Sequence, residues 1–316
     1  MVRRGGHAAR ALGKSGCRAP YAGAIIGHAG LSGVESFANR RMPRAMLGFS
    51  EWVDTDARQM SHQDTIREQF SRQAIGFSEA RSMADGDAIQ LLIEAAKADA
   101  AHRSLDVACG PGMVALAFAQ VVHCAIGLDT TRAMLDRARV LQDRQSRRNV
   151  AWVLGEATEL PFQEASCDIA TCRFAVHHML NPSLALQEMT RVVRPGGRIV
   201  ICDAVASDDP NKAAALNAFE KLRDPSTVRF LNLAELRNLL IDGGVQIEGE
   251  RKYRVPVEFD ELMQRSFPSR GDVPRLRDMM IASLEGDTLG LATRRENERI
   301  LFSYPAVVLA GQKPTN

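Results

Sequence analysis

The sequence predicts an α/β fold, with a doubly wound sheet of seven mostly parallel strands and an antiparallel last strand. Two observations support this prediction. From about residue 101 onward, short apolar runs alternate with amphipathic stretches, a pattern typical of strands covered by helices on both faces. The first of these runs also ends in a glycine turn, Gly110-Pro111-Gly112, that opens a helix.

Composition divides the chain into two parts. Residues 1–59 carry nine Lys and Arg against four Asp and Glu, and no helical or strand period persists in them. We therefore expect a disordered basic leader. An organelle transit peptide or a flexible basic tail would fit this composition, but Met60 and the polar segment after it slightly favour sequence translated upstream of the true start. The expected folded domain spans 60–316, with a core at about 101–206 and a roof built from 60–100 and 207–300.

Charge and cysteine content exclude several classes of protein. Hydrophobic residues make up 45% of the chain and charged residues 25%, but no apolar run approaches the roughly 20 residues of a membrane span. Beyond the leader, 31 Lys and Arg stand against 34 Asp and Glu, so we expect no nucleic-acid partner. The six cysteines form no Cys-x-x-Cys pair, which predicts buried thiols and no metal site. A reducing, cytoplasmic location follows unless the leader targets an organelle, and the oligomeric state is left open.

Periodicity predicts each element of the folded domain. At its start, Ile66, Phe70, Ile75 and Phe77 predict short helices. The expected strands are the apolar runs at 104–108, 123–129, 150–155, 168–174, 197–203, 246–257 and 304–311. The expected helices are the amphipathic stretches at 86–100, 113–121, 132–143, 183–193, 210–222 and 233–242. A charged helical insertion is expected at 258–300, near one edge of the sheet.

Local signals mark several helix ends. Asn181-Pro182 combines a capping residue with a proline suited to a first turn. The same helix is expected to end at Arg194-Pro195-Gly196-Gly197, which we interpret as a structural turn. Asn232 and Glu235 have the spacing of a capping box.

The glycine turn is the strongest chemical signal. It follows Leu105-Asp106-Val107-Ala108-Cys109, and in doubly wound sheets ligands bind beyond the carboxyl ends of the strands. Gly110 and Gly112 lack a Cβ, so the backbone can bend sharply and approach a ligand closely. Together with Ala115 the turn also satisfies the Gly-x-Gly-x-x-Ala dinucleotide fingerprint, so this segment alone does not identify one cofactor.

Carboxylates follow the next two strands. Asp129 ends the second strand, where a carboxylate can accept both ribose hydroxyls of an adenosine, each bond contributing about 1.5–3 kcal/mol. Glu156 follows the third strand, where it can accept an adenine amino group. Leu160 and Phe162 would give that adenine apolar cover.

In order, these segments resemble the class I S-adenosylmethionine-dependent methyltransferases, in particular the branch with the ubiquinone and menaquinone C-methyltransferases. The resemblance runs from about residue 60 to the C-terminus. The segments that carry it are Asp106-x-x-Cys-Gly-Pro-Gly112, Gly127-Leu-Asp129, Gly155-Glu-Ala157 with Leu160-Pro-Phe162, Arg173-Phe-Ala-x-His-His178 and Arg194-Pro-Gly-Gly197. It implies a Rossmann-like fold and methyl transfer from S-adenosylmethionine to a carbon, oxygen or nitrogen of a small molecule, releasing S-adenosylhomocysteine.

The resemblance also implies where the cofactor binds. Its cofactor-binding positions fall here on Asp106, Ala108, Gly110, Gly112, Asp129, Thr130, Glu156, Ala157, Arg173 and Phe77. The first four would surround the methionine part, Asp129 and Thr130 the ribose, and Glu156 and Ala157 the adenine, while the backbone near Arg173 would meet the amino group. Relatives more often have Asp in place of Glu156 and Tyr in place of Phe77.

Two further segments are candidates for chemistry on the acceptor. His177 and His178 follow the fourth strand, where one of them, with His178 slightly favoured, could act as a general base or orient the acceptor. Packing at a strand end is the alternative. Arg223, Asp224, Ser226 and Arg229 belong to a segment that resembles one in uncharacterised relatives and could face the substrate, although Asp-Pro-Ser is also an ordinary connector.

Other functions fit parts of the pattern. An NAD-linked oxidoreductase would use the same glycine turn, but a second nucleotide-binding half is not found in the sequence. A binding module that acts through its basic leader, and a non-methylating enzyme such as a decarboxylase or cyclase, would share the fold. Stabilisation by S-adenosylmethionine or by NAD would distinguish the first alternative.

Overall fold

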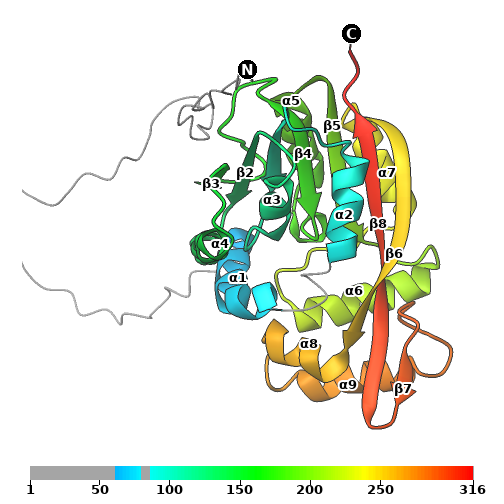
Figure 1. Cartoon of the computed structure of the whole chain (residues 1–316). Coiled ribbons are helices and arrows are strands. Elements are labelled where there is room, and N and C mark those ends of the chain that lie inside the picture. The colour runs from blue at the N-terminus through cyan, green and yellow to red at the C-terminus, as the bar shows by residue number, and fades with distance from the viewer. Residues whose placement is uncertain (1–60, 80–85, 316) are drawn as a thin grey trace, which may run out of the picture.

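The computed structural model describes residues 61–79 and 86–315, which form one α/β unit (Figure 1). The predicted leader, 1–59, lies outside the described residues. Within the described part, no helix is both long enough and apolar enough to cross a membrane.

Eight strands form one sheet in the order β3-β2-β1-β4-β5-β8-β6, with β7 paired to β8. The strands are β1 (Arg103–Val107), β2 (Cys124–Asp129), β3 (Val150–Leu154), β4 (Cys167–Arg173), β5 (Val193–Ala204), β6 (Gln246–Glu258), β7 (Arg294–Glu296) and β8 (Arg299–Gln312). The first five pair in parallel, whereas β8 lies antiparallel between β5 and β6. The predicted doubly wound sheet with an antiparallel last strand is therefore confirmed, although β7 adds an eighth strand to the seven that were expected.

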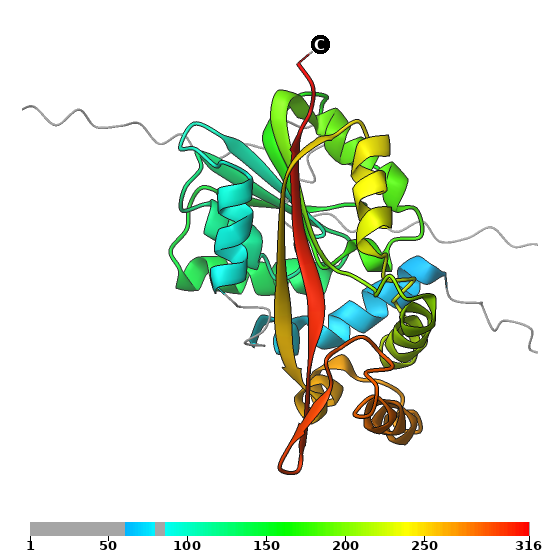
Figure 2. The ribbon, with the colours of Figure 1, turned by 90° about the vertical axis from the view of Figure 1, so that its right-hand side faces the viewer.

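Helices cover both faces of this sheet. They are α1 (His62–Glu79), α2 (Gly86–Ala95), α3 (Met113–Phe118), α4 (Arg132–Arg144), α5 (Pro182–Val192), α6 (Pro210–Arg223), α7 (Leu233–Asp242), α8 (Phe259–Ser266) and α9 (Val273–Ala282), with a 3₁₀ turn η1 (Val176–His178). Figure 2 shows α2 on one side of the sheet and α7 on the other. The helices α1, α6 and α8 gather at the end of the sheet where the parallel strands finish (Figure 1).

Three apolar cores match these layers. One packs α5 and α7 against the sheet through residues such as Leu186, Met189 and Leu240. A second packs α2 and α3 against the opposite face through residues such as Leu92 and Phe118. The third joins α6, α8 and α9 to the outer ends of β6 and β8. This third core fixes α6 and α8 beyond the strand tips.

Several element boundaries differ from the sequence prediction. The N-terminal segment is one 18-residue helix, α1, and not several short ones. Arg194–Gly197 lies within β5 and not in a turn before it; it forms an irregularity in the register with β4, which pairs at Val193 and again from Arg198, while Gly196 and Gly197 bond to the backbone of Lys313. The insertion is only partly helical, since β7 folds back on an extended β8. The capping box at Asn232 and Glu235 is present with both of its bonds at 2.9 Å.

Gly112 has a packing role at the start of α3. Its φ is +81°, and a Cβ built on it would lie 2.3 Å from the ring of Trp152. A Cβ built on Gly127 of β2 would lie 2.5 Å from the same ring. Trp152 is held by a hydrogen bond from its Nε1 to the side chain of Gln142, at 2.6 Å, so the ring cannot retreat freely.

We therefore expect Gly112→Ala to lower the free energy of unfolding by about 2–4 kcal/mol, from left-handed backbone strain and overlap with Trp152. Urea unfolding measures this loss. Gly244→Ala is the matched control, because Gly244 also has φ +81° but nothing lies within 4 Å of its added Cβ. Equal losses in the two variants would contradict the role of Trp152.

Candidate active site

Three adjoining cavities lie beyond the carboxyl ends of the parallel strands. The strand-tip cavity is lined by residues that include Asp106, Ala108, Gly110, Asp129 and Arg173. The outer cavity shares Ala108 and Thr130 with it and continues to Glu156, Ala157 and Leu184. The inner cavity lies between η1, α1, α6 and α8 and includes His177, Glu220 and Tyr304. Nine of the ten predicted cofactor residues thus line the first two cavities, and Gly112 lines neither.

Asp129 ties two loops together at the tip of β2. One carboxylate oxygen accepts the backbone N–H of Gly110 at 2.8 Å, and the other accepts that of Thr131 at 2.8 Å. The side chain is buried, and burial raises its pKa despite these two bonds. The carboxylate keeps further lone pairs for a ligand in the strand-tip cavity.

Asp106 presents a buried carboxyl oxygen without a partner. Its Oδ1 accepts the hydroxyl of Thr171 at 2.7 Å, whereas Oδ2 is buried and unpaired among the described residues. Burial raises the pKa of Asp106 to about 7. Next to it, Ala108 has a left-handed φ of 55°, and Phe174, also at the cavity, has 52°. Left-handed backbone at residues other than glycine is often found at functional sites.

The raised pKa of Asp106 gives a stability prediction. The unfolded carboxyl loses its proton near 3.8, but the folded one keeps it to about 7, so the folded state binds more protons in this window and stability falls as the pH rises through it. Asp106→Asn cannot titrate and therefore lacks this pH dependence. Between about pH 4 and 7 we expect the unfolding free energy of wild type to fall by roughly a few kcal/mol relative to that of the variant, measured by urea unfolding. Parallel curves would contradict this assignment.

Glu156 is engaged by α1 at the mouth of the outer cavity. Its Oε1 accepts the hydroxyl of Thr130 at 2.6 Å and pairs with the Arg67 guanidinium at 2.7 Å. His62, also on α1, bonds through Nε2 to the backbone oxygen of His178 at 2.8 Å. These contacts attach α1 to the tips of β2 and β3 and to η1.

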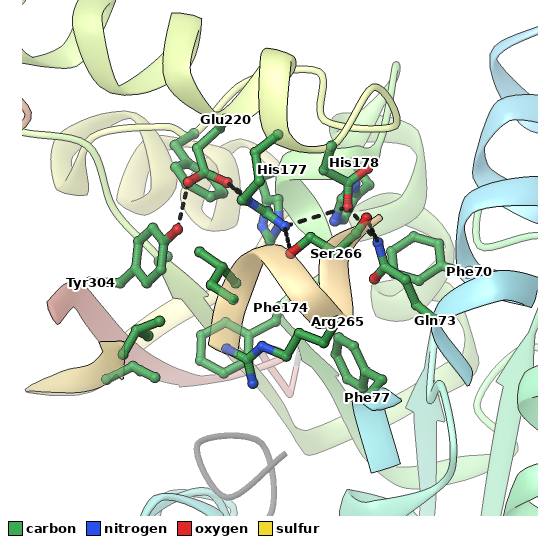
Figure 3. Close-up of a pocket in the computed structure, with 17 residues that line it drawn as sticks. Phe70, Gln73, Phe77, Phe174, His177, His178, Glu220, Arg265, Ser266 and Tyr304 are labelled. Carbon is green, nitrogen blue, oxygen red and sulfur yellow. Dashed lines mark hydrogen bonds and ion pairs between the residues drawn. The ribbon is translucent and has the colours of Figure 1, made fainter. Parts of the chain in front are cut away.

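His177 and His178 lie on η1, and the centroids of their rings are 4.2 Å apart (Figure 3). Phe230 packs edge-on against His177 at 4.4 Å, and Phe70 packs edge-on against His178 at 4.9 Å. Both histidines line the inner cavity, and His178 also lines the strand-tip and outer cavities. Phe70 likewise lies on the boundary between the strand-tip and inner cavities.

Asp203 was not among the predicted site residues. It lies one residue before the end of β5, next to η1, and its Oδ1 lies 2.6 Å from Nδ1 of His177. In the sequence it is the single acid that closes the apolar run at 197–203. Asp129 likewise closes the apolar run of β2, so the signal that identified Asp129 was also present for Asp203.

Buried charges close the inner cavity on the side of α6 (Figure 3). Glu220 is fully buried and accepts bonds from Arg223 at 2.6 Å and from the hydroxyl of Tyr304 at 2.6 Å. Arg223 also donates to Ser266 Oγ at 2.9 Å. The ion pair raises the pKa of Arg223, although burial works against this. Sequence reasoning missed Glu220 and Tyr304, which lie 84 residues apart and meet only in the fold.

The predicted substrate segment divides into two parts. Arg223 and Asp224 line the inner cavity, and Ser226 lies behind them, fully buried, with its Oγ 3.0 Å from Nδ1 of His178. Arg229 points elsewhere: its guanidinium pairs with Glu235 at 2.8 Å, beside a separate surface depression. The segment therefore connects to the histidines through Asp224 and Ser226.

Comparison with known proteins gives a consistent result. A family described as "Methyltransferase domain" matches residues 105–201. The Bacillus subtilis protein named "Uncharacterized methyltransferase YcgJ" is 32% identical over 251 residues, which are 77% of this chain and 97% of that protein. Its crystal structure is similar to this one with a TM-score of 0.68 at 28% identity, covering 73% of this chain and 99% of that chain.

Two other proteins extend the comparison. The BH2331 crystal structure from Bacillus halodurans has a TM-score of 0.68 at 27% identity, covering 73% of this chain and all of that one (100%). A demethylmenaquinone methyltransferase from Clavibacter sepedonicus is 33% identical over 135 residues, 42% of this chain and 54% of that protein. Because the similarity to YcgJ spans nearly that whole protein, this chain belongs to the S-adenosylmethionine-dependent methyltransferases.

Proposed function

We propose that this enzyme transfers the methyl group of S-adenosylmethionine to a small-molecule acceptor held in the inner cavity. One observation carries the proposal: the strand-tip and inner cavities adjoin, and the wall that they share is lined by Phe70, Phe77, Phe174 and His178. A donor in one cavity and an acceptor in the other would meet at this wall.

The residues around the first two cavities suit the donor. S-adenosylmethionine carries a positive sulfonium and an ammonium group, and the unpaired Oδ2 of Asp106 offers an acceptor for the latter. Asp129 would accept ribose hydroxyls, and Glu156 with Ala157 would contact the adenine. A bound ammonium group would favour the ionised form of Asp106, so that a carboxylate at each of three strand tips would complement a cationic adenosyl ligand.

When bound, S-adenosylmethionine supplies an electrophilic methyl group on a good leaving group. The protein then has to orient the two reactants and exclude water. Holding them at reacting distance can lower the activation barrier by about 7–11 kcal/mol, so a protein nucleophile is not required. The aromatic side chains of the inner cavity, including Phe70, Phe77 and Phe230, favour a small acceptor with an apolar body.

Binding and methyl transfer test the proposal together. Calorimetry with S-adenosylmethionine, S-adenosylhomocysteine and NAD should give binding of the first two and none of the third. Tritiated S-adenosylmethionine with a panel of hydroquinones, phenols and amines should then label an acceptor. Hydroquinones come first, because the Clavibacter relative is named for a menaquinone precursor. Binding of NAD without S-adenosylmethionine would instead support the oxidoreductase alternative.

A further inference from the structure

Asp203 holds His177 in one defined orientation. Its Oδ1 lies 2.6 Å from Nδ1 of His177, and its Oδ2 accepts the backbone N–H of His177 at 3.2 Å. The carboxylate is 2% exposed, and within the described part of the chain it forms no ion pair with Lys or Arg. A buried carboxylate beside Nδ1 stabilises a proton on that nitrogen, so Nε2 of His177 carries the free lone pair.

His178 is fixed in the same tautomer by a different route. Burial alone would raise the pKa of Asp224, but nearby Arg223 and the hydrogen bonds from Ser226 and Gln73 outweigh this and keep it below its ordinary value, so its carboxylate only accepts. The single hydroxyl proton of Ser226 is donated to Asp224 Oδ1 at 2.5 Å. The Ser226 oxygen can therefore only accept from His178 Nδ1–H, at 3.0 Å. This leaves Nε2 of His178 as an acceptor as well.

The two rings cannot share the same role. They lie 4.2 Å apart, and burial, together with the neighbouring His177 ring, lowers the pKa of His178 far below its ordinary value. His177 has a carboxylate to stabilise its imidazolium, whereas His178 contacts a neutral hydroxyl. No described group forms a hydrogen bond with Nε2 of either ring, and both rings line the inner cavity.

We propose that Asp203 is a positioning residue that makes His177 the proton acceptor for methyl transfer, while His178 stays neutral and orients the acceptor. This inference rests on the proposed function. A lone pair of the acceptor oxygen or nitrogen forms the new bond to the methyl carbon. The O–H or N–H bond of that atom breaks, its electron pair stays on the atom, and its proton moves to Nε2 of His177. The electron pair of the broken carbon–sulfur bond stays on sulfur, which becomes a neutral thioether. His177 later returns the proton to water.

Nitrogen-15 NMR of the protein with labelled histidine tests this assignment without any acceptor. Two-bond proton–nitrogen correlations should show Nδ1–H for His177, assigned from the spectrum of His177→Asn. In Asp203→Asn the amide can donate to Nδ1, so the His177 tautomer should switch to Nε2–H. Asp168→Asn is the control. Asp168 is an acid paired with Arg194 near the start of β4, at the end of the strand away from η1, so this substitution should change the tautomer of neither histidine.

Wild-type His177 with Nε2–H, or a tautomer unchanged by Asp203→Asn, would overturn the proposal, and the wild-type result stands even if the variant fails to fold. Calorimetry with S-adenosylmethionine on the same samples tests the proposed function separately. With an acceptor from the labelling panel, Asp203→Asn should lower kcat about 10²- to 10⁴-fold with little change in KM. A change confined to KM would contradict the inference.

Discussion

Loss of the Asp129 carboxylate is expected to weaken S-adenosylmethionine binding by about 100-fold or more. Two ribose hydroxyls would lose a charged acceptor, and each such bond contributes about 1.5–3 kcal/mol. The substitution Asp129→Ala also removes the acceptor for the backbone N–H groups of Gly110 and Thr131, so the glycine turn loses an anchor. Isothermal titration calorimetry measures the change.

Two variants control this experiment. Asp136→Ala removes an exposed carboxylate on α4 and should leave binding unchanged. Asp129→Asn keeps an oxygen for one of the two backbone N–H groups but loses the charge, so its affinity should fall between wild type and Asp129→Ala. Wild-type affinity in Asp129→Ala would place the ribose away from the tip of β2.

Loss of Glu220 is expected to cost up to about 3–5 kcal/mol of unfolding free energy, because Glu220→Ala leaves the buried Arg223 with only the more distant carboxylate of Asp224, at 3.9 Å. The hydroxyl of Tyr304 loses its acceptor at the same time. Urea unfolding followed by circular dichroism measures the loss.

The cost should come from the buried Arg223 charge that loses its close partner, and not from lost side-chain volume. Tyr304→Phe removes one hydrogen bond and should cost only about 0.5–1.5 kcal/mol. Glu220→Leu combined with Arg223→Met replaces both charges by apolar groups of similar size and should recover part of the stability, because the buried Asp224 then lacks Arg223 at 3.9 Å. A double variant less stable than Glu220→Ala would contradict this explanation.

Much of the fold could be predicted because its signals are local. Strands β1 to β5 are short apolar runs, and the capping pair Asn232 and Glu235 fixes the start of α7 within the sequence itself. The β7–β8 hairpin was not predicted, since the polar residues of β7 carry no strand period and pair only because β8 extends beyond the sheet.

The candidate site divides in the same way. Strand tips deliver Asp106, Asp129 and Glu156 to adjoining cavities, so their association follows from a parallel sheet alone. The inner cavity depends on α6, α8 and β8 meeting through tertiary packing. The pairing of Glu220 with Tyr304, for example, could not be inferred from spacing along the chain.

A crystal structure with S-adenosylhomocysteine tests the central claim most directly. The account predicts adenine against Glu156 and Ala157, ribose hydroxyls at Asp129, the amino group near Asp106, and the sulfur facing the wall that contains His178. A ligand bound elsewhere while these three strand tips stay free of it would contradict the account.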